Sequence, residues 1–356
     1  MIFNMKKIKR YTVNDVAKAA GTSITTVSRV MNSSKYPVSE ELRQKVMSIA
    51  AELNYFPNAA KKKSQHPILN EIGVIIPTIS NPFYAASIFG IQQEIQKYGY
   101  NILLCDTLRS EEKEREYLHM LYNKHVKGVI ISAVARDGQN VAYYVEKGMN
   151  IILLDQQIDG VKCDNILFDY REGARIATDY LINSGHRKIA YITTPMTKWT
   201  RREIFNGYCS ALRHNADFAQ EPILFEATDE QEENESTYES IVGKMLADQF
   251  IKSKCDATAV LCVNDMVAFG FIQGLAENGV KVPDNVSVIG IDDISFSSIF
   301  IPALTTVKSF AFEMGCFAGR MLVDRANGNE PLETSLKFGP KLIERSSVRK
   351  INVASF

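Results

Sequence analysis

The segment of residues 11–32, YTVNDVAKAAGTSITTVSRVMN, contains side chains that can contact the edge of a DNA base. Its second half has helical spacing and leaves four side chains on the outer face: Ile24, Thr25, Ser28 and Arg29. An arginine can hold guanine O6 and N7 in a bidentate contact, and a threonine can bond a base edge or touch a thymine methyl group. These residue types therefore predict non-covalent recognition of DNA.

Two short helices joined by a tight turn must position those side chains. Thr12 is expected to cap the first helix, with Asp15 as its capping-box partner, and Ser23 is expected to cap the second. Gly21 supplies the turn, because glycine adopts a positive φ without steric cost. The inward-facing positions are Val16, Ala17, Ala20, Val27 and Val30. This pattern is typical of a helix-turn-helix, although an ordinary helix pair in a small bundle is the alternative.

The charges of the chain are divided unevenly along the sequence. Residues 1–63 contain 12 Lys or Arg and 4 Asp or Glu, and the remaining residues contain 29 and 37, so net charges of +8 and −8 cancel. A basic segment of this kind attracts phosphate. We therefore expect the N-terminal segment to contact DNA and the acidic remainder to be repelled by it.

A third amphipathic helix is expected to begin after its N-cap, Ser39, and to end near Asn54. Its apolar stripe comprises Leu42, Val46, Ile49, Ala50 and Leu53. Pro57 ends this pattern, and the residues that follow are polar and basic. The sequence therefore predicts a three-helix headpiece over residues 1–57 and a linker over residues 58–71.

From residue 72 onward, apolar runs of strand length alternate with helical patterns. The expected strands are residues 72–76, 101–105, 129–131, 151–154, 189–192, 260–263 and 286–289. The expected helices are residues 84–97, 111–123 and 172–183. Continuous apolar strands separated by helices predict α/β lobes with doubly wound parallel sheets. Two such series predict two lobes, with a small-molecule site in the cleft outside the carboxyl ends of the strands.

Several functional classes are not supported by the sequence. It contains no run of 18 apolar residues, and its N-terminus, MIFNMKKIKR, lacks the apolar region of a secretory signal, so we expect a cytoplasmic, nucleoid-associated protein without a membrane span. The 6 cysteines and 5 histidines lack metal-ligand spacing. No phosphate-binding loop, zinc-protease pair or nucleophile motif occurs. We therefore expect no enzyme activity, metal or cofactor.

Seven segments of the chain resemble the LacI/GalR family of bacterial transcription regulators in order and spacing. They are residues 12–32, residues 53–60 (LNYFPNAA), residues 72–84 (IGVIIPTISNPFY), residues 184–192 (SGHRKIAYI), residues 263–270 (VNDMVAFG), residues 282–293 (VPDNVSVIGIDD) and residues 302–307 (PALTTV). The resemblance implies a helix-turn-helix headpiece joined to a periplasmic-binding-protein-like effector domain over residues 72–356. The first lobe would span about 72–168 and 308–338, and the second about 169–305 and 339–356.

The resemblance also implies roles for residues of the headpiece. The family acts as homodimers that read an imperfectly palindromic operator in double-stranded DNA. Ile24 and Thr25 stand where the family selects bases, and Arg29 stands where an arginine reaches the floor of the groove. The remaining residues expected to contact DNA, mainly at phosphates, are Thr12, Ser23, Thr26, Ser28, Asn32, Asn58, Lys61 and Lys62.

The linker departs from the family pattern. Ser64 stands where family members usually have a leucine that wedges into the minor groove, and a serine cannot supply an apolar wedge. The three preceding lysines, residues 61–63, can attract phosphate. We therefore expect less bending of the operator and a steep dependence of binding on salt, the alternative being a disordered basic linker.

By position, the resemblance implies an effector site made by Phe83, Asp155, Trp199, Arg202, Asn264 and Asp292. Carboxylates and amides at strand ends suit the vicinal hydroxyls of a sugar. Two features depart from the lac-type pattern. Ile204 occupies the position of its ligand arginine, so Arg202 is the nearest candidate, and residues 226–229 read EATD where an aromatic is usual.

The sequence thus predicts a repressor of carbohydrate-utilisation genes that is switched by a small molecule, most simply a sugar. The alternatives are a family regulator controlled by a protein corepressor or a non-sugar metabolite, and a transport-type sugar-binding protein. The missing secretory signal and the basic headpiece count against the last. Because no heptad pattern follows residue 347, a homodimer is expected, with an interface that includes the helix after NPFY and residues 310–325.

Overall fold

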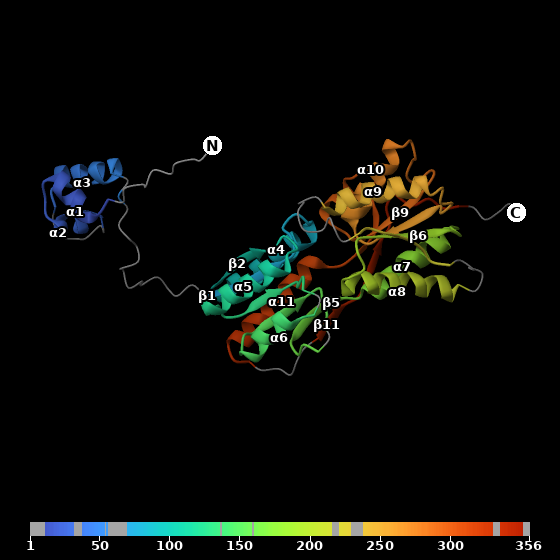
Figure 1. The fold of residues 1–356 in the computed structure, drawn as a ribbon, viewed down its shortest axis with the longest axis horizontal. Coiled ribbons are helices and arrows are strands. Elements are labelled where there is room, and N and C mark those ends of the chain that lie inside the picture. The colour runs from blue at the N-terminus through green and yellow to red at the C-terminus, as the bar shows by residue number, and fades with distance from the viewer. Residues whose placement is uncertain are drawn as a thin grey trace. The chain divides into compact units, whose positions relative to one another are not determined.

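The computed structural model describes residues 11–31, 38–53, 55, 70–135, 137–158, 160–215, 221–228, 238–329 and 335–351 (Figure 1). The chain divides into two compact units, Met1–Ile68 and Leu69–Phe356. Each unit has its own apolar core and is described by itself.

The first unit contains three short helices, α1 (Val13–Ala20), α2 (Ile24–Met31) and α3 (Glu40–Glu52). The predicted capping box is confirmed, because the Asp15 amide and side chain both bond Thr12. Gly21 ends α1 with a left-handed φ of 65°, and Ser23 Oγ accepts the Thr26 amide at 3.1 Å. The small core consists of Val16, Ala17, Ala20, Val27, Val30, Val46 and Ala50. The third helix ends at Glu52, two residues before the predicted end.

The second unit contains two six-stranded sheets. The first sheet has the order β11-β5-β4-β3-β1-β2, and all its strands are parallel. Its strands are β1 (Asn70–Ile76), β2 (Tyr100–Asp106), β3 (Val129–Ile131), β4 (Ile151–Leu154), β5 (Asp164–Phe168) and β11 (Ser335–Phe338). The helices of this lobe are α4 (Pro82–Ile95), η2 (Gln96–Tyr98), α5 (Glu111–Asn123), α6 (Gln139–Glu146) and α11 (Ala311–Ala326).

The second sheet has the order β12-β10-β9-β8-β6-β7, with only β12 antiparallel to its neighbour. Its strands are β6 (Ile189–Thr193), β7 (Ile223–Glu226), β8 (Ala259–Cys262), β9 (Ser287–Asp292), β10 (Thr305–Lys308) and β12 (Lys341–Ile343). The helices of this lobe are α7 (Tyr170–Asn183), α8 (Trp199–His214), α9 (Tyr238–Lys252), α10 (Asp265–Glu277) and η4 (Ser295–Ser298). The predicted pair of doubly wound α/β lobes is confirmed.

The chain passes between the lobes at three places, after β5, after β10 and after β11. As a result, α11 packs on α4 of the first lobe although more than two hundred residues separate them (Figure 1). Close approach requires glycine here, because a Cβ added at Gly90 would lie 2.1 Å from the Phe312 carbonyl oxygen. Within the described residues, no helix combines the length and apolar character needed to span a membrane.

The predicted boundaries of three elements differ from those observed. The helix after the first strand begins at Pro82 and not at residue 84, because Asn81 caps it and proline is well suited to the first helical turn. The strands expected at 260–263 and 286–289 are Ala259–Cys262 and Ser287–Asp292. The second shift matters, because it places the Asp292 carboxylate at the last residue of β9.

His186 is a buried histidine with a structural role, and it lies in the turn before β6. Its Nε2 is 3.2 Å from the carbonyl oxygen of Arg349, and its Nδ1 is 2.9 Å from the hydroxyl of Thr258. Because a carbonyl can only accept, Nε2 donates the proton and Nδ1 accepts from the threonine. Burial lowers the pKa of His186 to about 4, below its ordinary value of 6.5. The folded protein therefore holds a neutral imidazole.

This depressed pKa predicts a loss of stability in acid. Between pH 6.5 and about 4 the unfolded histidine binds a proton that the folded one excludes, so the free energy of unfolding falls as the pH falls through that window. We expect the advantage of wild type over His186→Gln in urea unfolding to shrink from pH 7 to pH 4.5, because the variant lacks this titration. An advantage of constant size would contradict the assignment.

Candidate functional site

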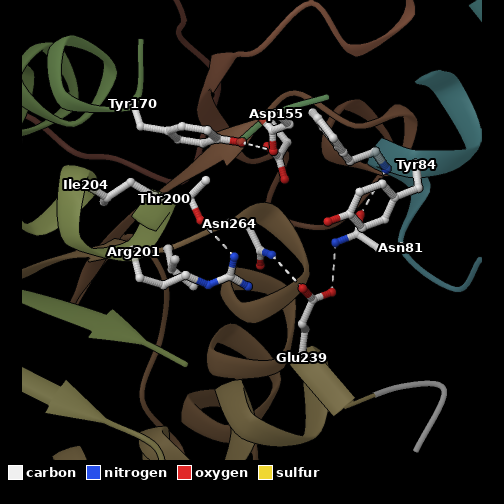
Figure 2. Close-up of a pocket in the computed structure, with 12 residues that line it drawn as sticks. Asn81, Tyr84, Asp155, Tyr170, Thr200, Arg201, Ile204, Glu239 and Asn264 are labelled. Atoms are coloured by element: carbon white, nitrogen blue, oxygen red, sulfur yellow. Dashed lines mark hydrogen bonds between the residues drawn. The ribbon is translucent and has the colours of Figure 1, made fainter. Parts of the chain in front are cut away.

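The candidate ligand site is a cleft at the carboxyl ends of the strands in both lobes, and it encloses about 360 Å³ not occupied by protein atoms. Asp155 follows β4, Asn264 follows β8, and Asp292 ends β9. The full lining comprises Asn81, Phe83, Tyr84, Asp155, Tyr170, Thr200, Arg201, Ile204, Glu239, Val263, Asn264 and Asp292 (Figure 2). A volume of this size suits a small polar molecule.

Asp155 presents an unused hydrogen-bond acceptor to the cleft. Its Oδ2 accepts the Tyr170 hydroxyl at 2.7 Å, whereas its Oδ1 is buried and has no hydrogen-bond partner among the described residues (Figure 2). The residue is only 7% exposed. Burial raises the pKa of Asp155 to about 7, against the lowering effects of Tyr170 and Arg201. A buried acceptor of this kind is costly unless a ligand supplies a donor.

Glu239, the second residue of α9, joins side chains from the two lobes. Its Oε2 accepts from Asn81 Nδ2 at 2.8 Å, and its Oε1 accepts from Asn264 Nδ2 at 3.0 Å (Figure 2). The Oε1 atom also lies 3.1 Å from Arg109 Nη2, and both side chains of this ion pair are 7% exposed. Burial alone would raise the pKa of Glu239, but Arg109 and Arg201 hold it below its ordinary value. Glu239 is therefore an ionised bridge between the lobes.

Two further carboxylates lie behind and beside this bridge. Burial and the neighbouring acids Asp265 and Asp155 raise the pKa of Asp292 well above its usual range. Asp265 is not part of the lining. It accepts the Ser297 hydroxyl at 2.6 Å and the Ile294 amide at 3.1 Å, and it thereby fixes the loop after β9. The position of Asp292 in the cleft thus depends on a buried network.

The first turn of α8 supplies the cationic side of the cleft. Thr200, Arg201 and Ile204 line it, and the Arg201 guanidinium donates to Thr194 Oγ1 at 3.1 Å and to Thr200 Oγ1 at 2.9 Å. The prediction of Arg202 as the ligand arginine is wrong in register. Arg202 is exposed and donates to the Thr197 carbonyl oxygen at 2.7 Å. One residue is about 100° of helical rotation, which turns Arg202 away from the cleft.

A second cavity adjoins the first and encloses about 290 Å³. The two share four lining residues: Tyr84, Asp155, Thr200 and Arg201. The rest of its lining comprises Pro77, Ser132, Ala133, Gln156, Lys198 and Trp199. The buried carboxylate of Glu114 holds one wall of this cavity in place, since it accepts the amides of Val134 and Ala135.

Of the predicted effector residues, the first cavity brings together Phe83, Asp155, Asn264 and Asp292. Trp199 lines the adjoining cavity. Side chains that the sequence analysis missed are Asn81, Tyr84, Tyr170, Arg201 and Glu239. Asn81 precedes a proline that begins a helix, and this capping signal was available in the sequence. Glu239 follows an acidic segment and had no such signal.

The predicted base-reading face lies on α2 of the headpiece. Ile24 is 47% exposed, Thr25 and Ser28 are exposed, and Arg29 is half-buried. Thr12, Ser23 and Thr26 bond within the headpiece as part of its helix caps. The other predicted DNA contacts, together with the atypical linker serine, lie outside the described residues: Asn32, Asn58, Lys61, Lys62 and Ser64.

Comparison with known proteins gives matches to both units. A model of the lacI family of bacterial regulatory proteins matches residues 12–58, and a model of the periplasmic binding protein-like domain matches residues 178–348. The HTH-type transcriptional repressor PurR of Mannheimia succiniciproducens is 31% identical over 341 residues, which cover 96% of this chain and 99% of that protein. PurR of Vibrio parahaemolyticus is 32% identical, with the same coverage of both chains.

Solved structures of similar proteins cover nearly the whole chain. The lac repressor dimer bound to operator and the anti-inducer ONPF is 27% identical, with a TM-score of 0.69 and coverage of 96% of this chain and 100% of that one. A complex of the regulator CelR with cellobiose is 26% identical, with a TM-score of 0.69 and coverage of 95% and 100%. A regulator from Enterococcus faecium with bound ribose is 27% identical, with a TM-score of 0.70, and matches 79% of this chain and 100% of its own.

Proposed function

The chain belongs to the LacI family of bacterial regulatory proteins, and we propose that it is a transcriptional repressor whose affinity for operator DNA is switched by a small molecule in the interlobe cleft. Its similar relatives are transcriptional repressors and not enzymes. In this proposal residues 1–57 read the operator, residues 58–71 form the hinge, and residues 72–356 bind the effector and a second copy of the chain. A protein that binds operator DNA acts in the bacterial cytoplasm, at the nucleoid.

The observation that supports a small-molecule effector is the unpartnered Oδ1 of Asp155. It lines both cavities and lies beside a second buried carboxylate, Asp292. A ligand that donates hydrogen bonds to these groups would bind one cleft conformation better than another. A 100-fold change in operator affinity needs coupling of about 2.7 kcal/mol, which a few such hydrogen bonds can supply.

A sugar is the ligand class that we propose first, with carbohydrate-utilisation genes as the matching targets. The carboxylates Asp155 and Asp292 can each accept from hydroxyl groups, and relatives have been solved with cellobiose and ribose. The aromatic lining favours a second class, a planar heterocyclic base. Tyr84, Tyr170 and Trp199 offer ring faces or edges to such a base. A protein corepressor would not use the cleft.

We test the cleft with a matched pair of variants, Arg201→Ala and Arg202→Ala. A panel containing glucose, ribose, cellobiose, adenine and hypoxanthine is first titrated against Trp199 fluorescence and by calorimetry. We expect Arg201→Ala to weaken binding of the active compound about 10- to 100-fold, because a charge-assisted hydrogen bond is lost, and Arg202→Ala to change it less than about 2-fold. Equal losses in the two variants would place the ligand elsewhere.

We propose that a homodimer forms through α4 and α11. Phe89 on α4 is 58% exposed, and its ring centroid lies 5.7 Å from that of Phe312 on α11, so an apolar surface spans both helices. We expect Phe89→Asp to convert a dimer into a monomer in light scattering, because a buried unpaired charge opposes association. Tyr143→Asp is the control, since Tyr143 is 54% exposed on α6. A Phe89→Asp dimer as stable as wild type would exclude this interface.

A further inference from the structure

The cleft has two compartments of opposite charge. The acidic compartment is the first cavity, in which Asp155, Glu239 and Asp292 outnumber Arg201. The basic compartment is the second cavity, in which Lys198 and Arg201 outnumber Asp155. A ligand that occupies both must therefore present hydrogen-bond donors at one end and acceptors, or negative charge, at the other.

The acidic compartment has little capacity for an anion. Its only cation is Arg201, and Arg109 behind it is already paired with the Glu239 carboxylate. The carboxylates of Asp155 and Asp292 would repel a negatively charged group, whereas hydroxyl groups can donate to both. The hydroxyl-bearing part of a ligand is therefore suited to this end of the cleft.

The basic compartment lies at the N-terminus of α8, a helix of 16 residues. Four consecutive residues, 198–201, line it, and Lys198 at the N-cap position makes no side-chain capping hydrogen bond. The first amides of a helix and its dipole favour a negative group, and two cationic side chains add to this preference. The buried, unpartnered Oδ1 of Asp155 also lines this compartment, which indicates that a ligand spans the boundary between the two.

We propose that the effector is a phosphorylated sugar, with its hydroxyls in the acidic compartment and its phosphate in the basic compartment beside Lys198 and Arg201. The proposal rests on the proposed function, since it specifies the ligand class of the same cleft. The ring of Trp199 borders the phosphate end and would report on its occupation. The sugar and its phosphate share one molecule, so neither compartment alone accounts for the affinity.

The test compares sugars with their own phosphate esters. Glucose and glucose 6-phosphate, and ribose and ribose 5-phosphate, are titrated against the full-length protein by Trp199 fluorescence and by calorimetry, with inorganic phosphate as a separate probe. We expect one ester to bind about 10-fold or more tightly than its parent sugar. Lys198→Ala should remove most of that preference and leave the parent sugar unaffected. Lys188→Ala is the control, because it removes the same charge from an exposed position of the same lobe.

Three results would overturn the proposal: a parent sugar that binds as tightly as its ester, an ester preference that Lys198→Ala and Lys188→Ala reduce equally, or no binding by any member of the panel. Operator binding is measured in parallel by fluorescence anisotropy on DNA selected from a random library. If operator DNA binds and no ester does, the ligand assignment fails while the repressor assignment stands. If no DNA is selected, the proposed function itself fails.

Discussion

Glu239→Ala will lower the free energy of unfolding of the effector domain by about 3–5 kcal/mol, the cost of removing one partner of a buried ion pair. The Glu239 carboxylate is buried with Arg109, and it also accepts hydrogen bonds from Asn81 and Asn264. The substitution leaves the guanidinium in a poorly solvated position without this carboxylate. Urea unfolding at pH 7, followed by circular dichroism, measures the loss.

Three further variants separate the ion pair from a general effect of substitution. Glu277→Ala breaks the Lys244–Glu277 pair, whose side chains are 45% and 47% exposed, so we expect a change below about 1 kcal/mol. Glu239→Gln keeps the shape and one acceptor oxygen and should lie between the two. The double variant Arg109→Met/Glu239→Met should recover part of the loss, because no buried charge remains. Equal losses in Glu239→Ala and Glu277→Ala would refute the buried bridge.

The regular parts of the fold follow from local patterns in the sequence. The strand at 129–131, the strand at 151–154 and the helix at 111–123 were predicted with their observed bounds, because buried parallel strands are short apolar runs and the helix has a serine cap and an acidic first turn. The edge strand β7 was not predicted. Its buried and exposed positions alternate, so it lacks the continuous apolar run of the central strands.

The candidate site was only partly predictable. Asp155, Asn264 and Asp292 each stand at the end of an apolar strand, a position that places them at the carboxyl edge of a parallel sheet. Glu239 reaches the cleft because the second lobe closes on Asn81 of the first, a contact between residues 158 positions apart. Periodicity along one segment contains no information about such a contact.

The arginine of the cleft illustrates a different limit. A motif offset of two residues made Arg202 the candidate, but α8 begins at Trp199 and turns Arg201 inward. Helical phase depends on where the first turn starts, and no capping side chain marks that start in the sequence. A shift of one residue changes the face by about 100°, so a ligand arginine cannot be assigned from spacing alone.

Arg29→Ala will weaken operator binding about 10- to 100-fold, the cost of losing a bidentate contact with a base pair. Arg29 lies in the last turn of α2, on the helix whose exposed face includes Ile24 and Thr25. The measurement is fluorescence anisotropy with an operator duplex obtained by selection and with a scrambled duplex of the same length and composition. Effector binding in the cleft, titrated separately, should be unchanged.

The control for that variant is Arg43→Ala, which removes the same charge from the same headpiece. Arg43 lies on α3 and pairs weakly with Glu40 at 3.9 Å, so its loss should reduce affinity for both duplexes by a similar small factor that higher salt diminishes. Arg29→Ala should instead reduce the ratio of operator to scrambled affinity, because a base contact supports one sequence only. If the two variants change that ratio equally, Arg29 contacts phosphate and does not read a base.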